Sequence, residues 1–160
     1  PQALGLMGPG HQRDPRIALM ANYDTVRYLR VPLPTVSVLR QLGLEAAAIQ
    51  QVANLSLYVS DQGALTNFHW DGRPGLLQQF HGRKRLWLVH PQYSAYLAHP
   101  EGKHTQCHRR SRFTGREERP MIPHWSVVIH PGQTVFIPAQ WWHQVESLDQ
   151  PTVGAVVRFS

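Results

Sequence analysis

The order of apolar and polar residues changes near Asn54. After this point the chain contains short runs that alternate with a period of two and are rich in β-branched and aromatic residues. The runs are LSLYVS, ALTNFHW, LLQQFH, KRLWLVH, SVVIHPG, QTVFIP, HQVESL and PTVGAVVRF. Turn signals such as Asp71-Gly72, His81-Gly82 and Pro131-Gly132 separate them. Seven or eight short strands joined by tight turns favour an all-β sandwich or barrel over a parallel βαβ sheet.

The first third of the chain has a different pattern. Residues 1–34 are rich in proline and glycine, which predicts irregular structure with one or two edge strands. Between Pro34 and Asn54 apolar residues recur at helical spacing, and Gly43 divides this stretch into two expected short helices. We therefore expect one domain over residues 1–160, with N-terminal strands and helices at 1–53 and a β-barrel core at 54–160.

The strand pattern lapses between Pro91 and Trp125, where we expect a long basic loop at 92–125 that runs over the surface. Such a loop could attract an acidic peptide or an RNA backbone, or it could be a solvated segment without a partner. It contains few aromatic residues, so stacking on single-stranded bases has little support. Its basic residues are Lys103, Arg109, Arg110, Arg112, Arg116 and Arg119.

Composition narrows the class of protein. Apolar residues make up 42% and charged residues 16% of the chain, which is typical of a folded globule. No stretch approaches the roughly 18 apolar residues of a membrane helix, and we find no signal peptide. Cys107 is the only cysteine, so an intrachain disulfide is excluded and a cytoplasmic location is expected. The chain does not begin with Met, which indicates a processed product or a truncated chain.

The first candidate metal-binding residues lie in the sequence FHWD. His69 and Asp71 lie two residues apart on an expected strand, so their side chains project from the same face. His143 lies far along the chain beside two tryptophans, in IPAQWWHQVES. Two imidazoles and one carboxylate on one face of a metal suit non-haem iron(II), because the opposite positions stay open. The two-residue motif alone also fits a strand histidine that caps a turn beside an ion-paired aspartate.

The sequence around these three residues is a more specific signal than the residues alone. Thr66, His69, Asp71 and Lys84 stand in the order T-x-x-H-x-D and then G-x-K-R, and PGQTVFIPAQWWH follows. Over roughly residues 55–159 this order resembles the JmjC or cupin-like 2-oxoglutarate oxygenases. The sequence is most similar to the asparaginyl hydroxylase of hypoxia-inducible factor. The resemblance implies an all-β core folded as a double-stranded β-helix (a jelly-roll or cupin barrel) with short N-terminal helices.

The resemblance also implies roles. His69, Asp71 and His143 would ligate Fe(II), while Lys84 and Thr66 would bind the distal carboxylate of the cosubstrate 2-oxoglutarate. The reaction would use O2 to hydroxylate a protein or peptide side chain, with release of succinate and CO2. Arg85, next to Lys84, should face the opposite side of its strand.

Two positions differ from the asparaginyl hydroxylase, which has asparagines where this chain has Gly75 and Arg158. If Arg158 points inward, it could bind a carboxylate of the cosubstrate or an acidic substrate; if it points outward, it is a solvated basic residue. Tyr58, on the strand before the metal motif, could reach the cosubstrate or only pack in the core.

The sequence also allows another metal site, other substrates and a non-catalytic function. His104, Cys107 and His108 have helical zinc-site spacing, although the basic residues around them would repel a cation. The substrate could also be RNA or a small molecule, and a barrel that lost turnover would be a non-catalytic cupin-type binding module. We expect no membrane partner, and the sequence does not determine the oligomeric state.

Overall fold

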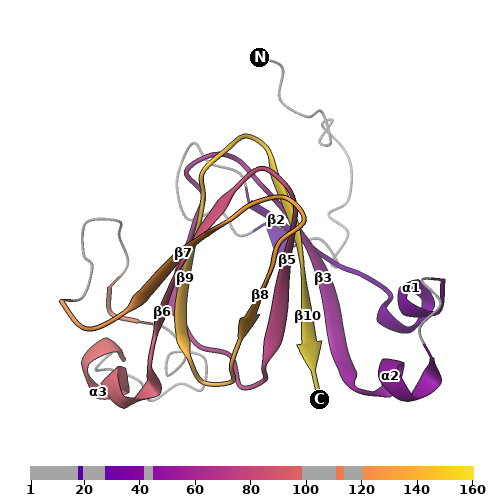
Figure 1. Cartoon of the computed structure of the whole chain (residues 1–160), viewed down its shortest axis with the longest axis horizontal. Helices are drawn as coiled ribbons and strands as arrows, with labels where there is room; N and C mark the ends of the chain where they lie inside the picture. Colours follow the sequence, from indigo (N-terminus) through magenta and orange to yellow (C-terminus); the bar gives the residue numbers. More distant parts are fainter. Residues whose placement is uncertain (1–17, 20–27, 42–44, 99–110, 114–120) are drawn as a thin grey trace.

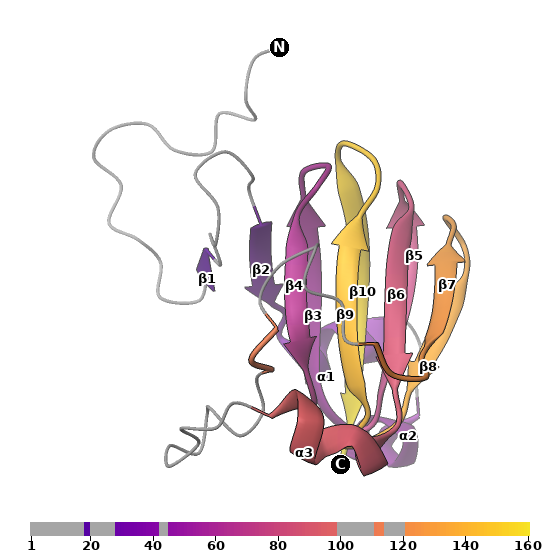
Figure 2. The same ribbon diagram turned by 90° about the vertical axis from the view of Figure 1, so that its left-hand side faces the viewer.

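Two antiparallel sheets face each other in the computed structural model, which describes residues 18–19, 28–41, 45–98, 111–113 and 121–160 (Figures 1 and 2). The six-stranded sheet has the order β1 (Ala18–Leu19), β2 (Tyr28–Pro32), β3 (Val52–Ser60), β10 (Thr152–Phe159), β5 (Gly75–His81) and β8 (Thr134–Ile137). The four-stranded sheet has the order β4 (Leu65–His69), β9 (Trp142–Ser147), β6 (Lys84–Val89) and β7 (Trp125–Ile129). The expected all-β double-stranded β-helix is confirmed.

The chain crosses between the sheets repeatedly, so strands that are distant in sequence become neighbours. β3 pairs with β10, and β4 pairs with β9. Tight turns make the crossings possible: Gly82 has φ +68° and Gly132 has φ +86°, a region that favours glycine. The turn at Gly82 also has no room for a side chain, because a Cβ there would lie 2.7 Å from the Pro151 carbonyl oxygen.

The space between the sheets is filled by alternate residues of the strands. Leu77, Leu86, Ile129, Ile137 and Val156 form a buried cluster there. Their burial follows from the period-two pattern, because every second side chain of each strand points inward. This cluster lies beside a pocket described below, so the core supplies the apolar wall of the candidate site.

Two short helices precede the barrel, as expected. They are α1 (Thr35–Gln41) and α2 (Ala46–Gln50), and they lie outside the six-stranded sheet (Figure 1). Ile49 of α2 packs on Leu55 and Ala155, which point outward from β3 and β10. Gly43, the expected break between the helices, lies outside the described residues.

The segment after β6 differs from the expectation of a loop over 92–125. It begins with the 3₁₀ turn η1 (Pro91–Tyr93) and the one-turn helix α3 (Ser94–Leu97), so the expectation is wrong for these residues. Leu97 is fully buried against Phe68, Trp87 and Trp142 on the outer face of the four-stranded sheet. A four-residue helix has no stability of its own, and this packing explains why the sequence pattern did not reveal it.

The rest of this segment is described only in part. Ser111 is buried, and its backbone N–H donates to the Phe68 carbonyl oxygen at 2.8 Å. Arg112 stacks over Tyr96, with its Cζ 4.8 Å from the ring centroid. The other basic residues of the segment lie outside the described residues. Within the described part of the chain, no helix is long and apolar enough to cross a membrane.

Candidate metal centre and its pocket

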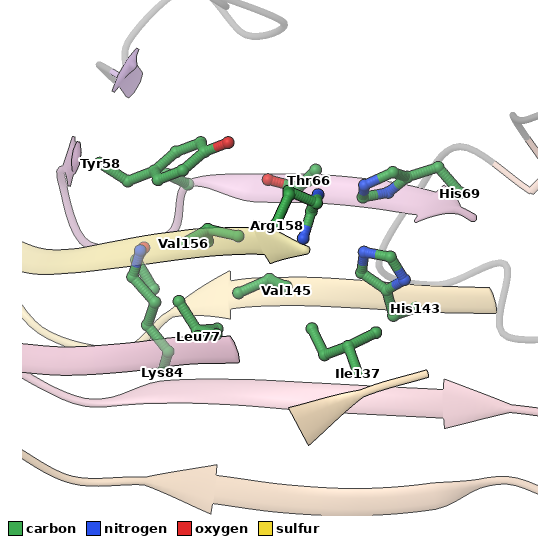
Figure 3. A pocket seen from close by; sticks show the side chains of 12 residues that line it. Tyr58, Thr66, His69, Leu77, Lys84, Ile137, His143, Val145, Val156 and Arg158 are labelled. Atoms are coloured by element: carbon green, nitrogen blue, oxygen red, sulfur yellow. The ribbon is translucent and has the colours of Figure 1, made fainter. Parts of the chain in front are cut away.

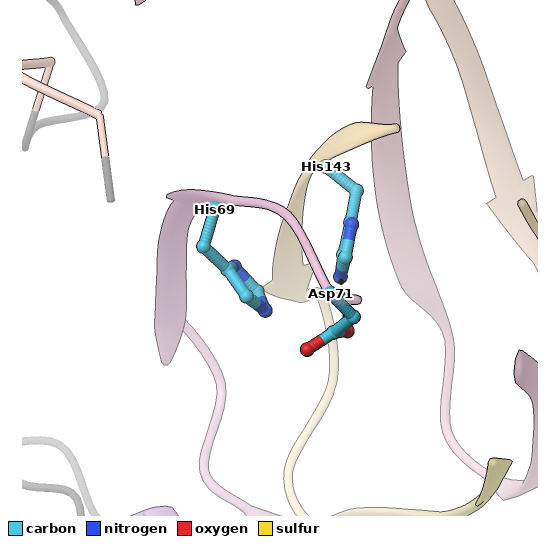
Figure 4. A group of neighbouring side chains, drawn as sticks. All are labelled: His69, Asp71 and His143. Carbon is cyan, nitrogen blue, oxygen red and sulfur yellow. Dashed lines mark ion pairs between the residues drawn. The ribbon is translucent and has the colours of Figure 1, made fainter. Parts of the chain in front are cut away.

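His69 and His143 meet because β4 and β9 pair in register at these two residues. His69 is the last residue of β4, and His143 is the second residue of β9. Their ring centroids are 4.2 Å apart. Asp71 follows the end of β4, and the ligand-type atoms of the three residues all lie within 4.8 Å of one another (Figure 4). Asp71 is thus beyond the strand on which we expected it, but it still projects beside His69.

Both imidazoles are oriented by backbone carbonyl groups. His69 Nδ1 lies 2.8 Å from the Asn67 carbonyl oxygen, and His143 Nδ1 lies 3.0 Å from that of Trp141. A carbonyl oxygen only accepts, so each Nδ1 carries the hydrogen and donates it. Nε2 of each ring is therefore the nitrogen with a free lone pair. This is the usual arrangement of histidines that bind a metal.

The carboxylate of Asp71 has an oxygen suited to a cation. Oδ2 is buried, lies 3.4 Å from His143 Nε2 and 2.5 Å from Arg158 Nη2, and accepts no well-aligned hydrogen bond from the described residues. The Asp71 backbone is held by the Gln140 N–H, which donates to its carbonyl oxygen at 2.8 Å. A fixed carboxylate with an unsatisfied oxygen beside two oriented imidazoles fits a divalent metal ion.

Protonation states agree with this fit. Burial, together with the charge of His143, lowers the pKa of His69 to about 3, so its ring is neutral at neutral pH. Burial raises the pKa of Asp71, but the contact with His143 and the charge of Arg158 outweigh it and lower that pKa to about 2. A neutral imidazole and an ionised carboxylate are the forms that bind metals.

A pocket extends from the two histidines into the barrel. Figure 3 shows side chains from both sheets pointing into it. Its lining residues are Tyr58, Ala64, Thr66, His69, Leu77, Lys84, Ile137, His143, Val145, Ser147, Val156 and Arg158. The predicted cosubstrate residues therefore lie in the same pocket as two of the predicted metal residues, His69 and His143. Their roles stay predictions.

Lys84 is a buried cation in this pocket. Its residue is only 3% exposed, and burial lowers its pKa to about 8. Among the described residues, no carboxylate forms an ion pair with it, although its pairing partner on β9, Ser147, also lines the pocket. Arg85 faces the other way, as expected: it is 39% exposed and lies 3.8 Å from Glu146. An enclosed ammonium group at the end of an apolar pocket is suited to bind an anion.

Arg158 faces the pocket, which resolves the alternative left open by the sequence. Its side chain is 15% exposed and contacts Asp71. Tyr58 both lines the pocket and packs on the inner core, so the two readings of that residue are compatible. Burial raises the pKa of the Tyr58 hydroxyl, which keeps it a neutral hydrogen-bond donor.

Several supporting residues were missed by the sequence analysis. The buried hydroxyl groups of Ser60, Ser147 and Thr152 form a network with oxygen–oxygen distances of 2.8 to 3.0 Å at the Lys84 end of the pocket. A sequence signal existed, since each hydroxyl residue lies at the end of an apolar strand run. Trp142 was also missed; its indole N–H donates to Ser94 Oγ at 2.9 Å and ties α3 to the strand of His143.

Three other described histidines, His81, His90 and His130, have ordinary positions. His81 ends β5, His90 accepts a hydrogen bond from the Gln92 N–H at the start of η1, and His130 follows β7. All three therefore stand at strand ends or turns. The zinc alternative at His104, Cys107 and His108 lies outside the described residues.

Sequence comparison gives one family and a group of relatives. The cupin-like domain profile matches residues 29–159. HSPB1-associated protein 1 from Rattus norvegicus is 31% identical over 107 residues, which cover 62% of this chain and 22% of that protein. Its Danio rerio homologue is 30% identical over 118 residues and covers 62% of this chain and 24% of that protein. The aligned region therefore spans less than a quarter of these relatives.

Structure comparison finds Escherichia coli YcfD, described as a ribosomal oxygenase. Its complex with cobalt and 2-oxoglutarate has a TM-score of 0.57 and 17% identity, covering 84% of this chain and 32% of that chain. Its complex with cobalt and succinic acid has a TM-score of 0.56 and 18% identity, covering 86% and 34%. At this identity the likeness shows the fold alone. The narrower similarity to the asparaginyl hydroxylase is not shown by these comparisons.

Proposed function

Because the chain belongs to the cupin-like domain family, we propose that it is an Fe(II)- and 2-oxoglutarate-dependent dioxygenase that hydroxylates a protein or peptide side chain. One observation carries the proposal. A cluster of two histidines and one carboxylate lies at one end of a pocket, and the buried Lys84 lines the same pocket. A metal-binding cluster and a buried cation in one pocket fit a metal and a dicarboxylate bound together. A barrel with a purely structural role would have no use for either group.

The residues would divide the work as follows. His69, Asp71 and His143 would hold the metal, and iron(II), when bound, would supply the activation of O2 for the oxidation of the keto acid and the substrate. Lys84 and the Thr66 hydroxyl would bind the distal carboxylate, with Tyr58 as a further donor, and so fix the direction of the cosubstrate. The apolar wall of Leu77, Ile137 and Val156 would exclude water around its aliphatic middle.

The substrate class rests on weaker support. The relatives are named for association with HSPB1, and YcfD is described as a ribosomal oxygenase, both of which favour a protein substrate. The similarity to the asparaginyl hydroxylase of hypoxia-inducible factor stays a prediction, as does a cytoplasmic location. A small acidic molecule is the second candidate substrate, because Arg158 faces the pocket. An RNA substrate would rest on the basic segment, most of which lies outside the described residues.

Turnover is the direct test. The chain is incubated with Fe(II), O2 and 2-oxoglutarate, alone and with peptide, RNA and small-molecule pools, while succinate and mass gains of one oxygen atom are measured. We expect succinate to require both iron and 2-oxoglutarate and to vanish in His69→Ala. His81→Ala, an exposed histidine at a strand end, is the matched control and should keep turnover. Bound iron without succinate under every condition would indicate the non-catalytic binding module instead.

A further inference from the structure

Gly75 and Arg158 are direct neighbours, although they lie 83 positions apart in the sequence. They are paired in register between β5 and β10. A Cβ on Gly75 would lie 2.5 Å from Arg158 Nη1 and 3.0 Å from the Val157 carbonyl oxygen. No side chain can occupy that position while the guanidinium is there. We call this space the Gly75 recess; it exists because residue 75 has no side chain, and the guanidinium of Arg158 fills it.

The two terminal nitrogens of Arg158 have different surroundings. Nη2 lies against Asp71 Oδ2, whereas Nη1 is buried and has no hydrogen-bond partner among the described residues. A buried N–H without a partner is unfavourable, and a planar guanidinium presents its donors in a fork that matches a carboxylate. Arg158 therefore has an unused donor at the metal end of the pocket.

The contact with Asp71 has a consequence for metal binding. Asp71 is the only carboxylate of the His69–Asp71–His143 cluster, and Arg158 lies on one of its oxygens. A guanidinium beside the cluster repels a divalent cation and competes with it for the same oxygen. An anion that draws Arg158 away from Asp71 would therefore strengthen metal binding, and metal binding would strengthen anion binding by the same factor.

The pocket indicates which anion this is. Two positively charged side chains, Lys84 and Arg158, line the pocket. Its apolar lining includes Leu77, Val145 and Val156. This suits a dicarboxylate with an aliphatic middle. Building on the function proposed above, we propose that Arg158, held in the Gly75 recess, binds the carboxylate at the keto-acid end of 2-oxoglutarate and releases Asp71 to the metal as it does so.

The first experiment measures binding without turnover. Cobalt(II), which does not consume the cosubstrate, is titrated into the chain with and without 2-oxoglutarate by calorimetry. In the wild type, 2-oxoglutarate should raise cobalt affinity on the order of tenfold. Arg158→Ala should bind cobalt alone more tightly, bind 2-oxoglutarate at least roughly tenfold more weakly and lose the coupling. Arg85→Ala, which removes the same charge from the outer face of β6, is the control and should behave as the wild type.

Gly75→Ala tests the recess itself. The added methyl group must displace the guanidinium, so this variant should weaken 2-oxoglutarate binding much as Arg158→Ala does. In the Arg158→Ala background the same substitution should have little further effect on 2-oxoglutarate binding, because the clash with the guanidinium is gone and only the 3.0 Å contact with the Val157 carbonyl oxygen remains. Additive effects of the two substitutions would overturn the role of the recess. Thermal unfolding of each variant shows that it is folded before binding is interpreted.

Ligand analogues identify the end at which Arg158 acts. 2-Oxopentanoate keeps the keto acid and lacks the distal carboxylate, whereas glutarate keeps both carboxylates and lacks the keto group. Lys84→Met should bind 2-oxoglutarate and 2-oxopentanoate about equally, while Arg158→Ala should weaken both and preserve their ratio. Unchanged 2-oxoglutarate affinity in Arg158→Ala would overturn the inference and leave the proposed function standing. Failure of the wild type with cobalt to bind 2-oxoglutarate would overturn the proposed function and this inference with it.

Discussion

The charged side chains at the two ends of the pocket differ in whether they have an oppositely charged neighbour. At the metal end, the Asp71 carboxylate lies close to the Arg158 guanidinium and the His143 imidazole, and both imidazoles are oriented by backbone carbonyl groups. At the other end, Lys84 is more deeply buried and has no ion-pair partner in the described part of the chain. The charges at the metal end thus have opposite charges beside them, whereas the Lys84 end retains an unfavourable charge that an incoming anion would neutralise. Removing the Lys84 charge should therefore raise the stability of the unliganded chain and lower its affinity for an anionic ligand.

The largest effect should come from His143→Ala. Loss of one of two imidazoles should reduce cobalt or iron affinity by more than about 100-fold, since even residues that only orient a ligand account for 10- to 100-fold. Succinate formation should disappear with it. Calorimetric titration of the metal provides the measurement, and His130→Ala, an exposed histidine after β7, is the control. Retained metal affinity would show that the cluster is not the metal site.

Lys84→Met should separate affinity from stability. Binding of 2-oxoglutarate should fall at least about 30-fold, because the partner of its carboxylate is lost. The unliganded chain should become more stable, by up to roughly 3 kcal/mol, since burial moves the lysine pKa from 10.5 to about 8 and each pKa unit is worth roughly 1.4 kcal/mol. Chemical unfolding of both proteins measures this. A loss of stability would mean that Lys84 is already compensated in the folded state.

The same lysine gives a pH dependence with a defined sign. Below about pH 8 Lys84 is charged in both the folded and unfolded chain, so its burial penalty is fully present. Between about 8 and 10.5 the unfolded chain binds more protons, and stability therefore rises with pH. The stability advantage of Lys84→Met over the wild type should shrink across this window. A constant difference between the two proteins from pH 7 to 10.5 would contradict the lowered pKa.

Ser60→Ala tests the hydroxyl network beside Lys84. Its hydroxyl group contacts those of Ser147 and Thr152, both at 2.8 Å, and all three residues are buried. Removing it should cost about 1 to 3 kcal/mol of stability. It should weaken 2-oxoglutarate only slightly, because Ser147 rather than Ser60 lines the pocket. Ser126→Ala, an exposed serine on β7, should change neither quantity.

The smallest effect is expected on the outer face of β6. Arg85 lies 3.8 Å from Glu146 and is well exposed, so Arg85→Gln should change stability by less than about 1 kcal/mol. It should leave 2-oxoglutarate binding unchanged. A loss of cosubstrate affinity comparable to that of Lys84→Met would show that the two faces of this strand are not functionally distinct.

The sequence predicted that His69, Asp71 and His143 would lie together, because strand periodicity and a specific motif agreed. It could not determine where Arg158 points, since counting from His143 crosses the turn between β9 and β10, which lie in different sheets. Alternation within β10 does give the direction: Val156 and Arg158 are two residues apart on this strand, so they point to the same face, and both line the pocket. The recess at Gly75 depends on long-range register between β5 and β10, and no local pattern contains that information. Helix α3 escaped detection for the related reason that tertiary packing forms it.

The arrangement of tryptophans around the cluster has a practical consequence. Trp70 stands between His69 and Asp71 and packs on the outer core, and Trp142 is fully buried directly before His143. Both indoles belong to the apolar cluster on the outer face of the four-stranded sheet, so they lie behind the two histidines rather than in the pocket. The chain thus carries intrinsic fluorophores next to its candidate metal. Quenching of their emission by a paramagnetic ion would report occupancy of the centre in real time, without a label.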